Sequence, residues 1–294
     1  MNRGQLARDR LRVERPTDVD AFLARAGDFL AAREEENSLL FGICSNLKAN
    51  PTMFANPAQF AVVIDEVDEP GRLAAAALRT PPHNLVLSAV DDLAVVDVLA
   101  DALAGESLPG VLGPAAAALR FVERWSARTG QRTERKIAER IFRLSVVRPP
   151  RPASGATRVA EPVDRELIAA WLRAFADEAL SEPFEDAEEA ADRWIAQTGR
   201  TLYLWQDGGR TVSLCGVGGA TPSGIRVGPV YTPPQHRGWG YASNLVARAS
   251  QAQLDAGCRF VFLVADLANP TSNKIYQGIG YEPVADVDQY VFLD

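Results

Sequence analysis

The first half of the chain switches between helical and strand-like patterns of apolar residues. Helices are expected where apolar residues recur every three or four positions, as they do after the candidate helix cap Thr17. Strands are expected where short apolar runs lie between turn residues such as Pro70-Gly71. The predicted helices cover residues 17–30, 34–47, 91–103 and 114–129, and the predicted strands cover residues 60–65, 72–79, 84–89, 110–112 and 141–147.

The second half gives the same order of elements with almost no residue identity to the first. Its predicted helices cover residues 164–179, 186–197, 241–256 and 270–279, and its predicted strands cover residues 201–206, 211–218, 225–231, 259–266 and 287–293. Residues 148–155 between the halves are rich in Pro, Ser and Gly, which is typical of a linker. We therefore predict two α/β domains, residues 1–150 and 151–294, either related by an internal repeat or alike by chance.

Composition narrows the class of protein and its partners. Apolar residues make up 47% of the 294 residues and charged residues 23%, as in folded water-soluble proteins. A formal net charge of -7 argues against nucleic acid or an anionic membrane as a partner. No membrane-spanning segment or leader is expected. Three scattered cysteines favour a reduced, cytoplasmic protein, and no Cys or His pair has metal-ligand spacing, so no metal is expected.

The first stretch with candidate chemistry runs from the strand end at Val230 through a loop into the helix at Tyr241. The first N–H groups of a helix have no partner within the helix, and they lie at the positive end of its dipole. Such a helix start suits a diphosphate, and the glycines at 238 and 240 allow close backbone approach. A dinucleotide loop is disfavoured because Ser243 replaces the third glycine of G-x-G-x-x-G. A glycine-bearing turn without a ligand is the simpler alternative for this stretch alone.

The second stretch, residues 266–281, passes from another strand into a helix that Asn269 can cap. Asn273 and Tyr276 lie three residues apart, so they share one face of that helix. Each has a structural alternative: the cap for Asn269, an exposed polar position for Asn273, and a half-buried aromatic for Tyr276.

Together the two stretches resemble the GCN5-related N-acetyltransferase (GNAT) family. In that family Q/R-x-x-G-x-G/A follows the fourth strand, as Gln235, Gly238 and Gly240 do here, and a helix with Asn and Tyr follows the fifth. The resemblance runs from about residue 157 to the C-terminus. It implies two GNAT-like domains, each a mixed, mostly antiparallel sheet flanked by helices, of which the N-terminal one is degenerate and the C-terminal one catalytic.

The resemblance also implies a function and roles for individual residues. The chain is expected to be an N-acetyltransferase that moves an acetyl group from acetyl-coenzyme A to a primary amine by direct attack on the thioester. Val230 and Thr232 would offer backbone groups to the pantetheine arm, and Tyr276 would protonate the departing thiolate. The implied cofactor-binding residues are Val230, Tyr231, Thr232, Gln235, His236, Arg237, Gly238, Trp239, Gly240, Tyr241, Asn269 and Asn273.

Several points stay open from the sequence. An amine is mostly protonated at neutral pH, so the reaction needs a base. The acidic residues near the expected site are more typical of a solvated surface than of a catalytic base; they are Glu182, Glu185, Asp186 and Asp266. The acceptor is a small-molecule or peptide amine, and neither its identity nor the oligomeric state follows from any pattern. The alternatives are a non-catalytic acyl-coenzyme A sensor or interaction protein, and an acyltransferase that uses a longer acyl group.

The N-terminal half lacks the phosphate loop at the corresponding passage. After its third strand the sequence has Asp91 and Asp92 and no glycine. These carboxylates suit the start of a helix but repel a diphosphate. We therefore expect residues 1 to about 150 to fold without binding coenzyme A.

Overall fold

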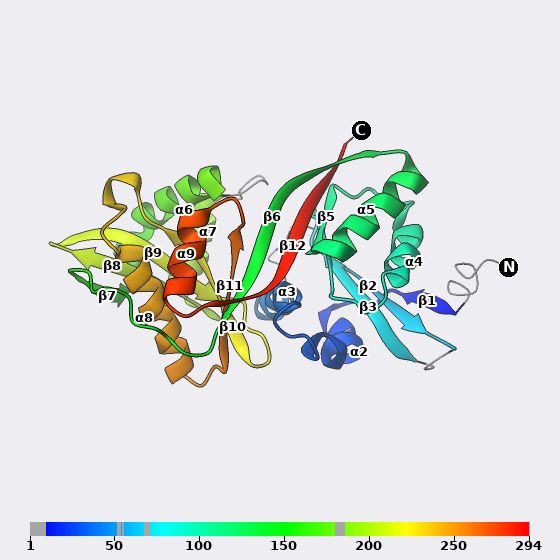
Figure 1. Ribbon diagram of the computed structural model, residues 1–294, viewed down its shortest axis with the longest axis horizontal. Helices are drawn as coiled ribbons and strands as arrows, with labels where there is room; N and C mark the ends of the chain where they lie inside the picture. Colours follow the sequence, from blue (N-terminus) through cyan, green and yellow to red (C-terminus); the bar gives the residue numbers. More distant parts are fainter. Residues whose placement is uncertain (1–9, 52–53, 55, 68–70, 180–185, 294) are drawn as a thin grey trace. The chain divides into compact units, whose positions relative to one another are not determined.

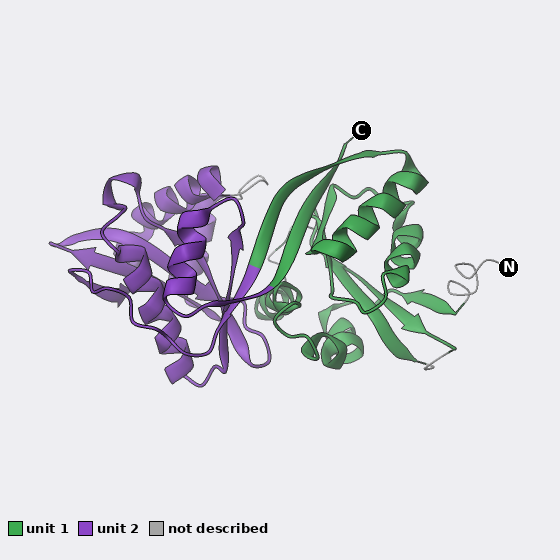
Figure 2. Ribbon diagram, in the orientation of Figure 1, with its two compact units in different colours: residues 1–140, 285–294 green, residues 141–284 purple. Residues whose placement is uncertain are grey.

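The structure is a computed structural model that describes residues 10–51, 54, 56–67, 71–179 and 186–293 (Figure 1). It divides into two compact units, shown in Figure 2: unit 1 comprises Met1–Arg140 with Ala285–Asp294, and unit 2 comprises Ile141–Val284. The boundary lies ten residues before the expected one at 150. The last ten residues also belong to unit 1, so unit 1 consists of two stretches of the chain and not of the single stretch expected.

Unit 1 follows the order of elements that the hydrophobic pattern predicts. Its strands are β1 (Leu11–Glu14), β2 (Gln59–Asp65), β3 (Arg72–Arg79), β4 (Leu85–Leu87), β5 (Gly110–Pro114) and parts of β6 (Arg132–Leu144) and β12 (Glu282–Leu293). Its helices are α2 (Val19–Ala31), α3 (Ser38–Ala49), α4 (Ala94–Leu103) and α5 (Ala115–Thr129). Each of the strands β1 to β4 pairs antiparallel with the next strand along the chain. Strand β5 follows α4 and pairs in parallel with β4, and β12 pairs antiparallel with β5.

The sheet of unit 1 has an apolar core on each face because its strand residues alternate. Phe60, Val62 and Ile64 pack with α2 and α3 on one face, whereas Ala61 and Val63 pack with α4 and α5 on the other. Two-residue periodicity sends alternate side chains to opposite faces, so a strand apolar at every position must be covered on both sides. This explains the unbroken apolar run of β2.

Unit 2 repeats this order. Its strands are β7 (Ala156–Val159), β8 (Arg200–Asp207), β9 (Arg210–Gly218), β10 (Gly224–Tyr231), β11 (Phe260–Asp266) and the remaining parts of β6 and β12. Its helices are α6 (Arg165–Ala179), α7 (Ala187–Ile195), α8 (Tyr241–Asp255) and α9 (Pro270–Gly278), with short 3-10 turns η1 (Pro162–Asp164) and η2 (Pro234–His236). Strands β7 to β10 pair antiparallel, and β11 joins β10 in parallel after α8.

Strand β9 separates the two cores of unit 2 by the same alternation. Leu214 packs in the core formed with α6 and α7, and its neighbour Cys215 packs in the core formed with α8. Each unit is thus a mixed, mostly antiparallel sheet flanked by helices, and the predicted fold class is confirmed.

Some expected details were wrong. Asp18, and not Thr17, caps α2, because its carboxylate accepts the Ala21 N–H at 2.8 Å. Strand β6 begins at Arg132, nine residues before the expected start at 141, because its first residues are charged and lack an apolar alternation. The four-residue strands β1 and β7 were not predicted, since each is too short for a periodic signal.

Candidate active site

The parallel strands β10 and β11 pair over only a small part of their length. Their register joins Gly224–Arg226 to Phe260–Phe262, after which β10 continues to Tyr231 and β11 to Asp266. Beside β9, strand β10 carries a bulge, because three steps from Val227 to Val230 match two steps from Val217 to Cys215. A bulge interrupts the ladder of hydrogen bonds and bends the strand. The C-terminal half of β10 is therefore an irregular strand end, where a ligand can meet backbone groups.

The loop that leaves β10 turns at two glycines before α8 starts. Gly238 has φ +83° and Gly240 has φ +81°, a left-handed conformation that other residues rarely adopt. A Cβ atom added at Gly238 would meet no atom within 4 Å, so this face of the loop is open. Gly240 is the N-cap of α8 and offers no side chain to the first N–H groups of the helix. The start of α8 thus retains the uncapped donors that a diphosphate requires.

Asn244, one turn into α8, fixes the start of this helix. Its side-chain amide donates to the carbonyl oxygens of Gly240 and Arg151, each at 2.9 Å. The sequence interpretation did not include this residue, although its position one turn after the glycines could have suggested it. The tether keeps the open face of the loop in place.

Arg237 folds back toward helix α6. Its Nε donates to the Thr232 carbonyl oxygen at 2.8 Å, and its Nη2 forms an ion pair with Glu178 Oε2 at 2.6 Å. The guanidinium lies 6.0 Å from the centre of the Tyr231 ring. Both charged side chains are about half exposed, so an incoming anion can reach Arg237 and compete with Glu178. Glu178 was not predicted from the sequence, because it lies 59 residues from Arg237.

The remaining loop residues divide into exposed and buried ones. Gln235 and Trp239 are exposed, Trp239 by 68%, and His236 is half-buried. Tyr231 and Tyr241 are buried, and the Tyr241 hydroxyl donates to Asp207 Oδ2 at 2.5 Å. The two tyrosine side chains are thus part of the packing beneath the loop, so their role toward a ligand is limited to backbone groups.

Helix α9 places its polar residues at the end of β11. Asn269 caps the helix, as its position suggests, by accepting the Ser272 N–H at 3.1 Å. The Asn273 amide donates to the Asp266 carbonyl oxygen at 2.9 Å, and its own Oδ1 is buried without a hydrogen-bond partner among the described residues. A buried acceptor without a donor is costly, and a ligand N–H would satisfy it.

Tyr276 lies half-buried on the same helix, with its ring edge-on to Tyr281 at 6.0 Å between centroids. Within the described residues its hydroxyl has no hydrogen-bond partner. Burial, with a smaller effect of the nearby Cys215 thiol, raises the pKa of this phenol above its usual value. Tyr276 and Val230 both pack against the core cluster that contains Cys215, the strand partner of Val230, so this helix face lies near the irregular end of β10.

The acidic residues considered as bases have other partners where the structure describes them. Asp186 caps α7, and the backbone N–H donors of Glu189 and Glu188 hold its pKa below the usual value, which makes it a weaker base. Asp266 accepts the Ala268 N–H at 2.7 Å. Glu182 and Glu185 lie outside the described residues.

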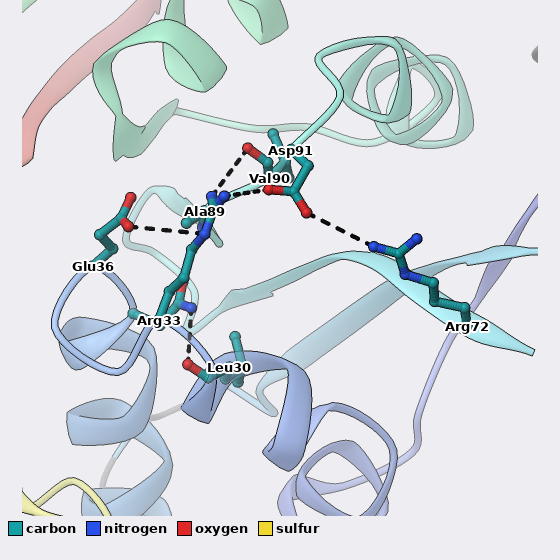
Figure 3. A network of polar contacts seen from close by, with 8 residues as sticks. Leu30, Arg33, Glu36, Arg72, Ala89, Val90 and Asp91 are labelled. Atoms are coloured by element: carbon teal, nitrogen blue, oxygen red, sulfur yellow. Dashed lines mark hydrogen bonds and ion pairs between the residues drawn. The ribbon is translucent and has the colours of Figure 1, made fainter. Parts of the chain in front are cut away.

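The corresponding passage of unit 1 has the opposite charge. After β4, the Asp91 carboxylate pairs with Arg33, which follows α2 (Figure 3). In unit 2 the arginine is in the loop and the acid is on the helix. Asp92 Oδ1 accepts the Ala94 N–H at 2.9 Å and so occupies a donor at the start of α4.

No group of three or more His, Cys, Asp or Glu residues with metal-binding geometry occurs among the residues that the structure describes. In the same part of the chain, none of the helices has the length and hydropathy of a membrane span.

Comparisons with known proteins agree with this geometry. Residues 166–281 match the family model "Acetyltransferase (GNAT) family", a range that contains the loop, α8 and α9. A search of curated proteins gave no match.

Several solved structures share the fold over nearly the whole chain. A GNAT-family acetyltransferase from Colwellia psychrerythraea has a TM-score of 0.56 at 10% identity, with 96% of this chain and 100% of that chain covered. A GCN5-related N-acetyltransferase from Sphaerobacter thermophilus has a TM-score of 0.55 at 16% identity, with 97% and 96% covered.

A tandem GNAT protein from the clavulanic acid biosynthesis pathway has a TM-score of 0.59 at 14% identity, with 96% of this chain and 98% of that chain covered. At such identities the likeness concerns the fold, and it extends to both units. The chain therefore carries, over residues 166–281, a domain of the acetyltransferase (GNAT) family, within the fold of a tandem GNAT protein.

Proposed function

We propose that unit 2 transfers an acetyl group from acetyl-coenzyme A to a primary amine. The observation that carries this proposal is the grouping of two features on one strand end. The loop after β10 leads into an uncapped helix start with an open glycine face, and Tyr276 packs against the same core cluster as Val230 at the end of β10. The family match supports acyl transfer, and the donor, the acceptor and the residue roles are our inference.

Acetyl-coenzyme A is the substrate that fits these residues. The free N–H groups at the start of α8 and the Arg237 side chain suit its diphosphate, with Gln235, His236 and Trp239 at the edge of the loop. The orphaned Asn273 Oδ1 suits an amide N–H of the pantetheine arm. We assign the backbone groups of Val230 and Thr232 to the part of the pantetheine arm between these two points.

The chemistry assigned to this chain consists of positioning and one proton transfer. The amine nitrogen attacks the thioester carbonyl carbon, a carbon–nitrogen bond forms, and the carbon–sulfur bond breaks. Tyr276 gives its phenolic proton to the departing thiolate, and the phenolate then regains a proton from solvent. Burial raises the pKa of the phenol, which keeps it protonated before the reaction but makes it a weaker acid than a free tyrosine. The amine must also lose a proton, and bulk water at the mouth of the site is sufficient to accept it for an acceptor that binds as the free base.

A transfer assay tests the proposal. Thiol release from acetyl-coenzyme A is followed with polyamines, aminoglycosides, amino acids and peptides, and acetylated product is identified by mass spectrometry. We expect amine-dependent release with one of these classes. Saturable acetyl-coenzyme A binding without product from any class would favour the binding-only sensor, and faster release from propionyl- or longer acyl-coenzyme A would identify a different acyl donor.

A further inference from the structure

Unit 1 contains a cavity of about 400 Å³. It lies between α2 with the turn that follows it, the start of β3, and the passage after β4, all within unit 1. Pockets for small molecules usually enclose roughly 300 to 1,000 Å³, so this volume is enough for one small molecule. The cavity is distinct from the candidate active site, which belongs to unit 2.

One face of α2 is turned to the cavity, and of its residues Phe29 also packs against the edge of the core. Phe22, Ala26 and Leu30 pack into the core of unit 1. The cavity face carries two charged and two apolar residues at the spacing i, i+3, i+4 and i+7, namely Arg25, Asp28, Phe29 and Ala32. A helix face that combines both charges with an aromatic ring, beside a cavity, can contact an amphiphilic ligand.

The walls of the cavity are held together by buried hydrogen bonds (Figure 3). Asn37 is 1% exposed; its amide donates to the Leu30 carbonyl oxygen at 3.0 Å, and its Oδ1 accepts the Ala89 N–H at 2.9 Å. Arg33 adds a second link, because its Nη1 donates to the Val90 carbonyl oxygen at 3.2 Å and its Nη2 to Asp91. The end of α2 and the passage after β4 are thus fixed before any ligand arrives.

The charges around the cavity are of both signs. Arg33 and Arg72 both pair with Asp91, the second at 3.8 Å. Arg25 pairs with Glu14, with its Nε 3.3 Å from the carboxylate, and both side chains are partly exposed, so an incoming carboxylate can compete for the guanidinium. Asp28 makes no ion pair with any described residue. The Arg25 guanidinium and the Asp28 carboxylate, three residues apart on α2, can therefore both contact a ligand in the cavity.

We propose that this cavity binds a small zwitterion, a free α-amino acid, with its carboxylate on Arg25 and its ammonium on Asp28. A guanidinium binds a carboxylate through paired hydrogen bonds, and a carboxylate accepts from an ammonium. Phe29 and Leu73 supply an apolar surface for the side chain of the ligand. A diphosphate would meet two carboxylates here and a diamine would meet three guanidinium groups, so a ligand with one charge of each sign fits best.

Calorimetric titration of the full-length protein with each of the twenty amino acids tests this proposal. We expect saturable binding of at least one amino acid in the absence of acetyl-coenzyme A. For that amino acid, the N-acetyl derivative and the primary amide each lack one charge, and each should bind at least ten-fold more weakly. A derivative that binds as well as the parent would overturn the two-charge recognition, and the absence of saturable binding by any amino acid would overturn the proposal.

Variants separate this cavity from an amino-acid acceptor site in unit 2. Asp28→Asn and Arg25→Gln should each weaken binding at least ten-fold, whereas the matched changes Asp177→Asn and Arg132→Gln, at exposed positions outside the cavity, should leave it unchanged. Thermal unfolding of each variant shows that it is folded. Equal affinity of both cavity variants and the wild type would place the amino acid elsewhere and contradict the proposal.

Discussion

Tyr276 combines a ring that packs on Tyr281 with a hydroxyl that has no partner among the described residues. The two functions of the side chain are therefore separable: the ring contributes packing, and the hydroxyl is available to a ligand. Burial raises the pKa of the phenol, so it stays protonated at neutral pH and loses its proton only above its usual value near 10.

Tyr276→Phe is expected to lower the rate of acetyl transfer by about 10²- to 10⁴-fold, the range typical of general acid catalysis. Affinity for acetyl-coenzyme A should change much less, because the ring remains in place. Single-turnover kinetics with calorimetry on the same variant separate the two effects. An unchanged chemical rate constant would assign Tyr276 to packing alone. In the wild type, no loss of rate from this phenol is expected as pH rises from 7 to 9.

Glu178→Gln is expected to strengthen acetyl-coenzyme A binding by about two- to five-fold, because the diphosphate no longer competes with a carboxylate for Arg237. An exposed ion pair contributes about 0 to 1 kcal/mol, which limits the effect to this range. Glu188→Gln, which removes a similarly exposed carboxylate paired with Arg173, is the matched control. Weaker binding by the Glu178 variant alone would show that this carboxylate supports the cofactor site.

At the level of elements, the hydrophobic pattern predicted the strands and helices that carry the site. Each of β10, α8, β11 and α9 has a clear period and ends at, or within three residues of, Gly, Asn or Pro. The cap at Asn269 followed from the same reasoning. The ion pair of Arg237 with Glu178 could not be predicted, since nothing local links two residues that the fold brings together. Nor could the pairing of Val287–Val291 with β5, which assigns the last strand residues to unit 1.

Asp164, which directly precedes α6, bonds to Arg158 on β7, and its substitution tests how much this link between the two elements stabilises unit 2. Its carboxylate accepts two hydrogen bonds from Arg158, both at 2.6 Å, and one from the Glu161 N–H at 2.9 Å. Asp164→Asn is expected to destabilise unit 2 by about 1 to 3 kcal/mol at pH 7, since it leaves Arg158 without its charged partner. Calorimetric unfolding of variant and wild type measures this difference.

The effect should depend on pH. Arg158 lowers the pKa of Asp164 below its usual 3.8, so the stabilisation is present above that value and is lost as pH falls through the lowered pKa. The gap in melting temperature between wild type and Asp164→Asn should therefore be large at pH 7 and smaller at pH 3. An equal gap at both values would show that hydrogen bonding geometry, and not the charge, is what stabilises this junction.

At the scale of the whole molecule, the two units share an order of elements but have opposite charges at the same passage. Unit 2 has Arg237 in its loop and an uncapped helix start, whereas unit 1 has Asp91 in its loop and Asp92 bonded to the Ala94 N–H at the start of α4. A diphosphate is attracted to the first arrangement and repelled by the second. We therefore expect one acetyl-coenzyme A per chain. A truncated chain of residues 1–150 is unsuitable for testing this, because it lacks the strand residues 287–291 that pair with β5.

The most direct measurement is a calorimetric titration of the full-length chain and of Gly238→Val with acetyl-coenzyme A. The left-handed backbone at Gly238 strains a branched side chain, and that side chain would occupy the open space that the diphosphate needs. The wild type should bind one molecule per chain, and the variant, if it melts at a temperature close to that of the wild type, should show no saturable binding. A stoichiometry of two, no binding by the wild type, or unchanged affinity of the variant would contradict a single coenzyme A site at the start of α8.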